Sequence, residues 1–128
     1  MTLNIVIKGR PITKKNNGEI VYIKGRPKIL PSRRYREYAR AALFQIPKDA
    51  KLNIDYPCNV KCVYFMPTKQ KVDLTNLEEG TDDILTAAHV IKDDNVNIVA
   101  THDGSHVRYD KENPRVEIEI KPKAEGVE

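Results

Sequence analysis

Acidic side chains are concentrated in one short stretch of this sequence, between Asp73 and Asp94. The stretch holds seven acids against a single base, Lys92. The acids are Asp73, Glu78, Glu79, Asp82, Asp83, Asp93 and Asp94. Carboxylates that approach one another repel, and each raises the pKa of its neighbour, so a convergent group of them needs a cation. Their spacing decides whether this stretch is a solvated surface or a metal site.

The residues after the first of these acids are predicted to form a helix. The segment 75–78 has the Thr-x-x-Glu pattern of a capping box, which predicts a helix from Thr75 to about His89. Glu78 and Asp82 fall on a separate flank of this helix, where we expect them to be solvated. The stripe expected to be buried consists of Leu77, Thr81, Ile84, Leu85 and Ala88.

The remaining acids share a face of the predicted helix or flank its ends. On a helical wheel of about 100° per residue, Asn76, Glu79 and Asp83 lie within about 60° of one another. Asp73 precedes the helix, and Asp94 lies in the turn that follows it. A strand after that turn can return Asp94 to the helix. We therefore expect Asp73, Glu79, Asp83 and Asp94 to converge on one spot.

A site made only of carboxylate and amide oxygens favours Mg²⁺ or Mn²⁺ over zinc. Such a metal activates a water molecule and stabilises the leaving oxygen of a phosphodiester. The alternative interpretation is that these acids are solvated surface charges and that Asp73 is an extra capping residue. His102 and His106 have the spacing of a helical zinc pair, but Gly104 and the flanking strand pattern argue against a helix there.

The basic residues are concentrated in the first part of the chain. Residues 1–48 carry 12 Lys and Arg against 2 Asp and Glu, whereas residues 49–128 carry 10 against 16. A basic segment of this kind favours binding of a polyanion such as nucleic acid. A solvated basic surface is the alternative. Because the arginines of the predicted first helix share one sign of charge, we expect them to contact phosphates.

The rest of the sequence predicts strands around two helices. A helix is expected from Arg33 to about Ile46, capped by Ser32 and ended by Pro47. Strands are expected at 3–8, 20–23, 28–30, 58–65, 96–101 and 116–120, and the second and third of them form a hairpin around 25–27. This mixture predicts an α+β fold, a single domain over residues 1–128 with a mixed β-sheet and two main helices.

Length and composition limit the class of protein. A chain of 128 residues with 40% hydrophobic and 31% charged residues fits one globular domain. No apolar run approaches the roughly 20 residues of a membrane span. Cys58 and Cys62 are expected on one strand, about 13 Å apart, which is too far for a disulfide. We therefore expect a soluble cytoplasmic protein.

Three segments of the acidic region resemble one known family. The segments 73–77 (Asp-Leu-Thr-Asn-Leu), 83–85 (Asp-Ile-Leu) and 90–95 (Val-Ile-Lys-Asp-Asp-Asn) together look like those of the RusA-type Holliday junction endonucleases. The helix start at 31–38 and the basic segment 9–15 are also similar. The resemblance covers most of the chain. It implies a small homodimer that cuts four-way DNA junctions symmetrically with Mg²⁺ or Mn²⁺.

The resemblance also implies site residues, with two departures. The first and last catalytic carboxylates of the family map to Asp73 and Asp94, but the middle one is replaced by Thr75. The family often has a catalytic lysine where this chain has Glu79. Glu79 lies one helical turn after Thr75 and can supply the missing carboxylate. The lysines that could replace the lost base are Lys69, Lys71 and Lys92.

The function predicted from these observations is metal-dependent hydrolysis of phosphodiester bonds in branched DNA. The predicted catalytic residues are Asp73, Glu79, Asp83 and Asp94, of which Asp73, Glu79 and Asp94 bind the metal, with Thr75, Asn76 and Asp93 in support. The predicted DNA contacts are Lys14, Lys15, Arg33, Arg34, Arg36, Lys69 and Lys71. The departures at positions 75 and 79 keep open a non-catalytic junction-binding module. A basic RNA-binding protein is supported by charge alone.

Overall fold

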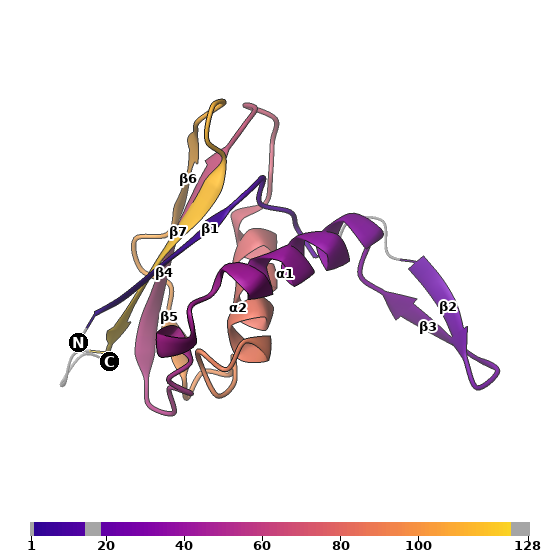
Figure 1. The fold of residues 1–128 in the computed structure, drawn as a ribbon, viewed down its shortest axis with the longest axis horizontal. Helices are drawn as coiled ribbons and strands as arrows, with labels where there is room; N and C mark the ends of the chain where they lie inside the picture. Colours follow the sequence, from indigo (N-terminus) through magenta and orange to yellow (C-terminus); the bar gives the residue numbers. More distant parts are fainter. Residues whose placement is uncertain (1, 15–18, 124–128) are drawn as a thin grey trace.

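The computed structural model describes residues 2–14 and 19–123 of the chain (Figure 1). Its elements are β1 (Leu3–Lys8), β2 (Glu19–Ile23), β3 (Arg26–Leu30), α1 (Arg33–Gln45), the 3₁₀ turn η1 (Lys48–Ala50), β4 (Cys58–Met66), α2 (Leu74–Ala87), β5 (Val99–Thr101), β6 (His106–Tyr109) and β7 (Arg115–Pro122). The predicted α+β fold with a mixed sheet and two main helices is confirmed. No helix in the described part of the chain is both long enough and apolar enough to cross a membrane.

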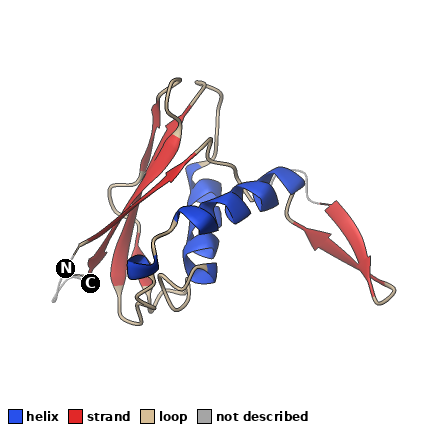
Figure 2. Cartoon of the chain, in the orientation of Figure 1, coloured by secondary structure: helices blue, strands red, loops and turns tan. Residues whose placement is uncertain are grey.

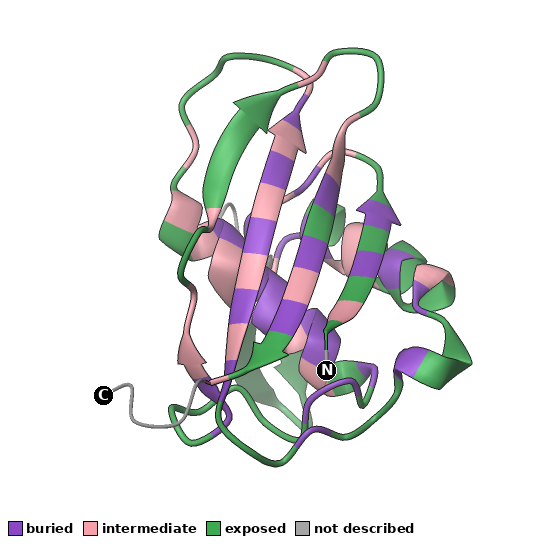
Figure 3. Cartoon of the chain, turned by 90° about the vertical axis from the view of Figure 1, so that its left-hand side faces the viewer, coloured by how far each residue is buried: buried purple, intermediate pink, exposed green. Residues whose placement is uncertain are grey.

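The central strand of the five-stranded sheet is β4 (Figure 2). It pairs antiparallel with β7, which pairs antiparallel with β1, and its other edge pairs parallel with β5 and β6. Alternate residues of β4 are buried, from Cys58 to Met66 (Figure 3). Both cysteines lie on this buried face and are free, as predicted. The two helices cover this face, and the hydrophobic core lies between them and the sheet.

Close packing joins the two helices. The Ser32 hydroxyl caps α1 by accepting a hydrogen bond of 3.2 Å from the Tyr35 amide, as the sequence predicts. Tyr35 is buried, and its hydroxyl donates to the Gly80 carbonyl of α2 at 2.8 Å. A Cβ atom on Gly80 would lie 2.9 Å from a Tyr35 ring carbon. The missing side chain at position 80 is therefore what allows α1 and α2 to approach this closely.

The ends of α2 differ from the prediction. The helix begins at Leu74, and its cap is Asp73, whose carboxylate accepts a 3.3 Å hydrogen bond from the Asn76 amide. Aspartate is at least as strong a cap as threonine, so the earlier start satisfies a backbone donor that a start at Thr75 would leave to water. The helix stops at Ala87, before His89 adopts a left-handed φ of 61°.

One predicted strand in the second half of the chain starts later than expected, and one strand was missed. The strand predicted at 96–101 begins only at Val99, because the Asn95 carbonyl accepts hydrogen bonds from the Ile98 and Val99 amides and holds the preceding residues in a turn. The edge strand β6 was not predicted. Its four residues, His-Val-Arg-Tyr, alternate polar and apolar, but the run is as short as a strand pattern can be and all four residues are exposed, so the signal is weak.

The predicted hairpin is confirmed as β2 and β3, which form a separate two-stranded sheet extending away from the rest of the molecule (Figure 1). Ile20 pairs with Ile29, and Tyr22 pairs with Pro27. Paired residues share one face, and this face leaves Ile20, Tyr22 and Ile29 exposed by 66%, 74% and 78%. A two-stranded hairpin of this kind is at best marginally stable alone in water.

Candidate active site

One lysine ammonium pairs with the predicted catalytic carboxylate Asp83 and lies within electrostatic range of two others, Glu79 and Asp94. Lys14, in the loop after β1, forms an ion pair with Asp83 of α2. The hydrogen bond to Asp83 raises the pKa of Lys14 against the opposing effect of burial, and the charges of Asp83, Glu79 and Asp94 raise it further. The structure therefore brings Glu79, Asp83 and Asp94 together, with a cation already beside them.

Asp94 lies close to Asp83, and the turn after α2 holds it there. Burial raises the pKa of Asp94, and hydrogen bonding and charge from Asp83 and Asp93 raise it further. The Asp93 carboxylate orders this turn by accepting hydrogen bonds from the Asp94 amide at 2.7 Å and from the Asn95 side chain at 3.0 Å. Those bonds lower the pKa of Asp93. Asp93 therefore stays ionised and supports the position of Asp94.

Glu79 faces the first helix as well as the cluster. The Tyr35 hydroxyl lies beside this part of α2, and its pKa is raised by burial and then by the charges of Asp83 and Glu79. The side chain of Glu79 is half-buried. Glu79 and Asp83 thus share one side of α2, as the helical wheel predicts. The structure shows that this side faces α1 and the loop carrying Lys14.

Asp73 and Thr75 lie at the other end of α2. Asp73 is exposed and acts as the helix cap, and Thr75 is exposed in the first turn. Ten residues of helix separate Asp73 from Asp83, which is about 15 Å of axial rise. The Asp73 carboxylate accepts its hydrogen bond from the Asn76 amide of the helix cap, whereas Asp83 is bonded to Lys14. The convergence predicted from the sequence is thus seen for three carboxylates and not for Asp73.

The cluster offers oxygen donors that fit a hard divalent cation. In the described part of the chain, no three His, Cys, Asp or Glu side chains form a ready-made metal cage. Instead, the Lys14 ammonium occupies a position where positive charge is stabilised by Asp83, with Glu79 and Asp94 nearby. Asp83 and Asp94 lie close together and offer only oxygen donors. Such donors, without sulfur or imidazole, match the ligand preferences of Mg²⁺ and Mn²⁺.

The other flank of α2 is buried, which corrects the prediction for Glu78 and Asp82. Asp82 is 7% exposed and accepts a 2.9 Å hydrogen bond from Nε2 of His102. Nδ1 of His102 donates to the Val60 carbonyl at 2.8 Å and lies 3.4 Å from a Glu78 oxygen. Because these two acids face the sheet and a cation rather than solvent, they anchor α2 to β4 and to the segment after β5.

His102 is therefore a charged structural residue. Burial disfavours its cation, but the hydrogen bond and charge of Asp82, the Val60 carbonyl and Glu78 together raise the pKa of His102 to about 9. His102 and His106 do not lie on a helix, as the sequence indicates, because His106 begins β6. Nδ1 of His106 contacts the Gly104 carbonyl at 2.7 Å. Burial raises the pKa of Asp82, and the bond from His102 opposes that effect.

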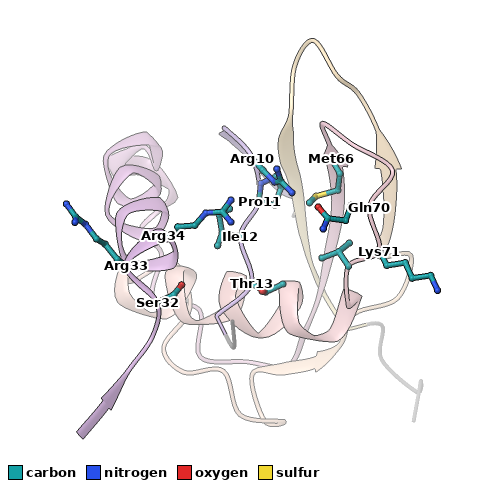
Figure 4. A pocket seen from close by; sticks show the side chains of 11 residues that line it. Arg10, Pro11, Ile12, Thr13, Ser32, Arg33, Arg34, Met66, Gln70 and Lys71 are labelled. Carbon is teal, nitrogen blue, oxygen red and sulfur yellow. The ribbon is translucent and has the colours of Figure 1, made fainter. Parts of the chain in front are cut away.

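A basic pocket of about 370 Å³ lies beside the start of α2 (Figure 4). Its walls come from the loop after β1, the start of α1, and the segment between β4 and α2. The lining residues are Arg10, Pro11, Ile12, Thr13, Ser32, Arg33, Arg34, Met66, Gln70, Lys71 and Val72. None of these is acidic. Of the predicted DNA contacts, Arg33, Arg34 and Lys71 are therefore in one place.

The other predicted DNA contacts are distributed differently. Lys14 is at the carboxylate cluster, and Lys15 lies outside the described residues. Arg36 is half-buried on α1. The Lys69 ammonium lies 5.4 Å from the centre of the Tyr109 ring. Of the described lysines, Lys14 is the one placed at the carboxylates, rather than the predicted Lys69, Lys71 or Lys92.

Comparison with known proteins agrees with the sequence resemblance. A search of curated proteins gave no match. The family model described as Endodeoxyribonuclease RusA matches residues 3–121. The matched region includes β1, both helices, the carboxylate cluster, the basic pocket and nearly all of β7. This chain therefore belongs to the RusA endodeoxyribonuclease family, the nucleases that resolve Holliday junctions.

Proposed function

We propose that Asp83, Asp94 and Glu79 bind Mg²⁺ or Mn²⁺ and form the centre at which this protein hydrolyses DNA. The observation that carries this proposal is the Lys14–Asp83 ion pair, with Glu79 and Asp94 close enough for their charges to act on the same ammonium. A divalent cation bound there would supply an activated water and stabilise the leaving oxygen. Asp94 is supported by Asp93, and Asp83 and Glu79 are held on one face of α2, so the donors are fixed before DNA arrives.

Asp73 is included in the proposed catalytic set on different grounds. It matches the first carboxylate of the family motif, and it directly follows Val72, which lines the basic pocket. A strand of DNA held in that pocket would therefore pass the Asp73 carboxylate. Thr75 and Asn76 occupy the same first turn of α2, and we propose that they support this end of the site.

Lys14 has a double role in this proposal. In the protein without a metal, its ammonium neutralises Asp83. A divalent cation would compete with it for the same carboxylate and release the ammonium toward the DNA phosphates. The basic loop, the start of α1, Lys69 and Lys71 would hold the phosphates on either side.

We further propose that the protein is a homodimer that cuts a four-way junction on two symmetric strands. Two cuts require two active sites, and a twofold axis supplies them. The β2–β3 hairpin supports this proposal, because it exposes Ile20, Tyr22 and Ile29 on one face and is far from the core of its own chain. Packing against a second chain would cover that face.

The proposed function is tested by incubating the purified protein with a synthetic four-way junction and with a linear duplex of the same sequence. We expect paired cuts in the junction with Mg²⁺ or Mn²⁺, no cuts with EDTA, and little cutting of the duplex. Junction binding with no cleavage under any metal would instead support the non-catalytic binding module.

A further inference from the structure

We infer that the basic pocket beside α2 binds one unpaired nucleotide of the DNA strand that is to be cut. This inference rests on the proposed function and adds a binding site to it. The pocket volume of about 370 Å³ is in the lower part of the range of about 300–1,000 Å³ that holds small ligands. A duplex backbone needs an open groove, whereas a single nucleotide needs a concave site of this size.

The charges of the pocket favour a phosphate. Arg34 extends from α1 toward the loop after β1, and Arg10 extends from that loop near Met66, whereas Arg33 and Lys71 extend away from the pocket (Figure 4). In the described residues, neither Arg10 nor Arg34 has a side-chain hydrogen bond or ion pair to another residue. Guanidinium groups bind phosphate oxygens through paired hydrogen bonds, so two of them lining one pocket form a phosphate site.

The start of α1 adds to this preference. Ser32 caps the helix and lines the pocket together with the first helical residues, Arg33 and Arg34. The N-terminal end of a helix carries a partial positive charge and free amide groups, both of which stabilise an anion. The phosphate would therefore lie between this helix end and Arg10.

The remaining walls favour a nucleobase. The exposed Gln70 amide offers both a donor and an acceptor to a base edge, beside the small apolar surfaces that the buried Pro11 and Met66 leave in the wall. The Thr13 hydroxyl is buried in the wall and has no hydrogen-bond partner in the described structure. Its oxygen has essentially no exposed surface, so we expect the bound nucleotide to bond to Gln70 rather than to this hydroxyl.

The position of the pocket connects it to the chemistry. Thr13 in its wall precedes Lys14, which pairs with Asp83, and Val72 in its opposite wall precedes Asp73. A nucleotide bound here would fix the adjoining phosphodiester near the carboxylates. Removing a base from its stack costs least where it is already unpaired, so the pocket would select DNA at a branch point.

The test uses the fluorescence of 2-aminopurine, which rises when the base leaves the stack. The base analogue is placed in turn at each position within two nucleotides of the exchange point of a static four-way junction. Spectra are taken with Ca²⁺ and saturating protein, so that neither cleavage nor incomplete binding contributes. We expect a rise of at least threefold at one position on the cut strand with the parent protein.

Variants inside and outside the pocket test whether the pocket causes the rise in fluorescence. Arg34→Gln and Arg10→Gln should each remove at least half of that rise, and Arg34→Lys should restore only part of it. Lys48→Gln is the control, because Lys48 is an exposed basic residue of η1 that lies outside the pocket and outside the predicted DNA contacts. No rise at any position, or a rise that persists in both pocket variants at saturation, would overturn the inference. Cleavage with Mg²⁺ is measured separately, so a failed nuclease assay leaves this result interpretable.

Discussion

Asp82 and Asp83 are neighbours in α2, yet cations from different parts of the chain neutralise them. Asp82 accepts a hydrogen bond of 2.9 Å from His102, which follows β5, and Asp83 forms an ion pair with Lys14, which follows β1. The first pair is buried against the sheet, and the second lies at the candidate active site. The helix that carries the proposed catalytic acids is therefore tied to the sheet by a residue next in sequence to one of those acids.

The His102 pair makes stability depend on pH. The pKa of His102 is raised from 6.5 to about 9, so the folded protein holds this proton more tightly than the unfolded chain. The stabilisation is complete below pH 6.5 and is lost as the pH rises through about 9. We expect the free energy of unfolding, measured with urea, to fall by about 3 kcal/mol between pH 6 and pH 9.5.

The variant His102→Gln separates the contribution of His102 from general destabilisation of the protein at alkaline pH. His102→Gln leaves Asp82 buried beside no cation, and we expect it to cost about 3 kcal/mol at pH 6. Its stability should change much less than that of the parent between pH 6 and pH 9.5. Equal pH dependence in the two proteins would show that His102 is not the titrating group.

The close approach of α1 and α2 makes Gly80 sensitive to substitution. Gly80→Ala should destabilise the fold by about 1–3 kcal/mol, because the new methyl group would meet the Tyr35 ring. Thermal and urea unfolding measure this change. In a Tyr35→Leu background the same substitution should stabilise the helix, since alanine has the better helix propensity by about 1 kcal/mol. An equal loss in both backgrounds would place the strain elsewhere.

Lys14 should compete with divalent cations. Lys14→Met removes a positive charge from Asp83, so we expect Mn²⁺ to bind several-fold more tightly to the free protein, while junction cleavage becomes slower. Titration calorimetry measures the first effect and single-turnover cleavage the second. Lys111→Met is the control, since it removes the same charge from an exposed lysine of the turn after β6, outside the carboxylate cluster and the predicted DNA contacts. Weaker Mn²⁺ binding in Lys14→Met would contradict the proposed competition.

The exposed face of the β2–β3 hairpin should hold the two chains together. Ile20→Lys and Ile29→Lys place like charges on that face, and we expect each to shift the protein toward the monomer in light scattering at micromolar concentration. Val96→Lys alters another exposed apolar residue and should leave the mass unchanged. A parent protein that is monomeric and active would rule out the dimer.

Much of the fold could be predicted from local patterns. The alternation at 3–8 and 58–65, the Ser32 cap and the hairpin all appear in the structure, because each depends on residues close in sequence. The edge strand β6 was missed, since its run of alternating residues is only four residues long and all of them are exposed. The start of α2 was misplaced because Asp73 and Thr75 are both good caps.

The candidate site was predicted in part. The helical wheel correctly separated Glu79 and Asp83 from Glu78 and Asp82, but it could not show which flank faces the sheet. That depends on His102, which lies 20 residues after Asp82. The pairing of Lys14 with Asp83 spans 69 residues and leaves no local signal.

Asparagine variants test the individual carboxylates without changing their shape. Asp73→Asn keeps a good helix cap, so a loss of cleavage would reflect chemistry rather than folding. We expect this variant to lose cleavage and to bind the junction at least as tightly as the parent, because a negative charge is removed. Gel-shift and cleavage assays measure the two effects, and full cleavage by Asp73→Asn would remove Asp73 from the catalytic set.

The most direct test of the account is single-turnover cleavage of a four-way junction by Asp83→Asn and Asp94→Asn over a Mg²⁺ titration. Asp49→Asn, a change at an exposed acid of η1, is the control. We predict that both cluster variants cut at least 100-fold more slowly than the parent at every Mg²⁺ concentration while binding the junction normally, and that the control cuts like the parent. Cleavage at the parent rate by either cluster variant would contradict the claim that these carboxylates form the active site.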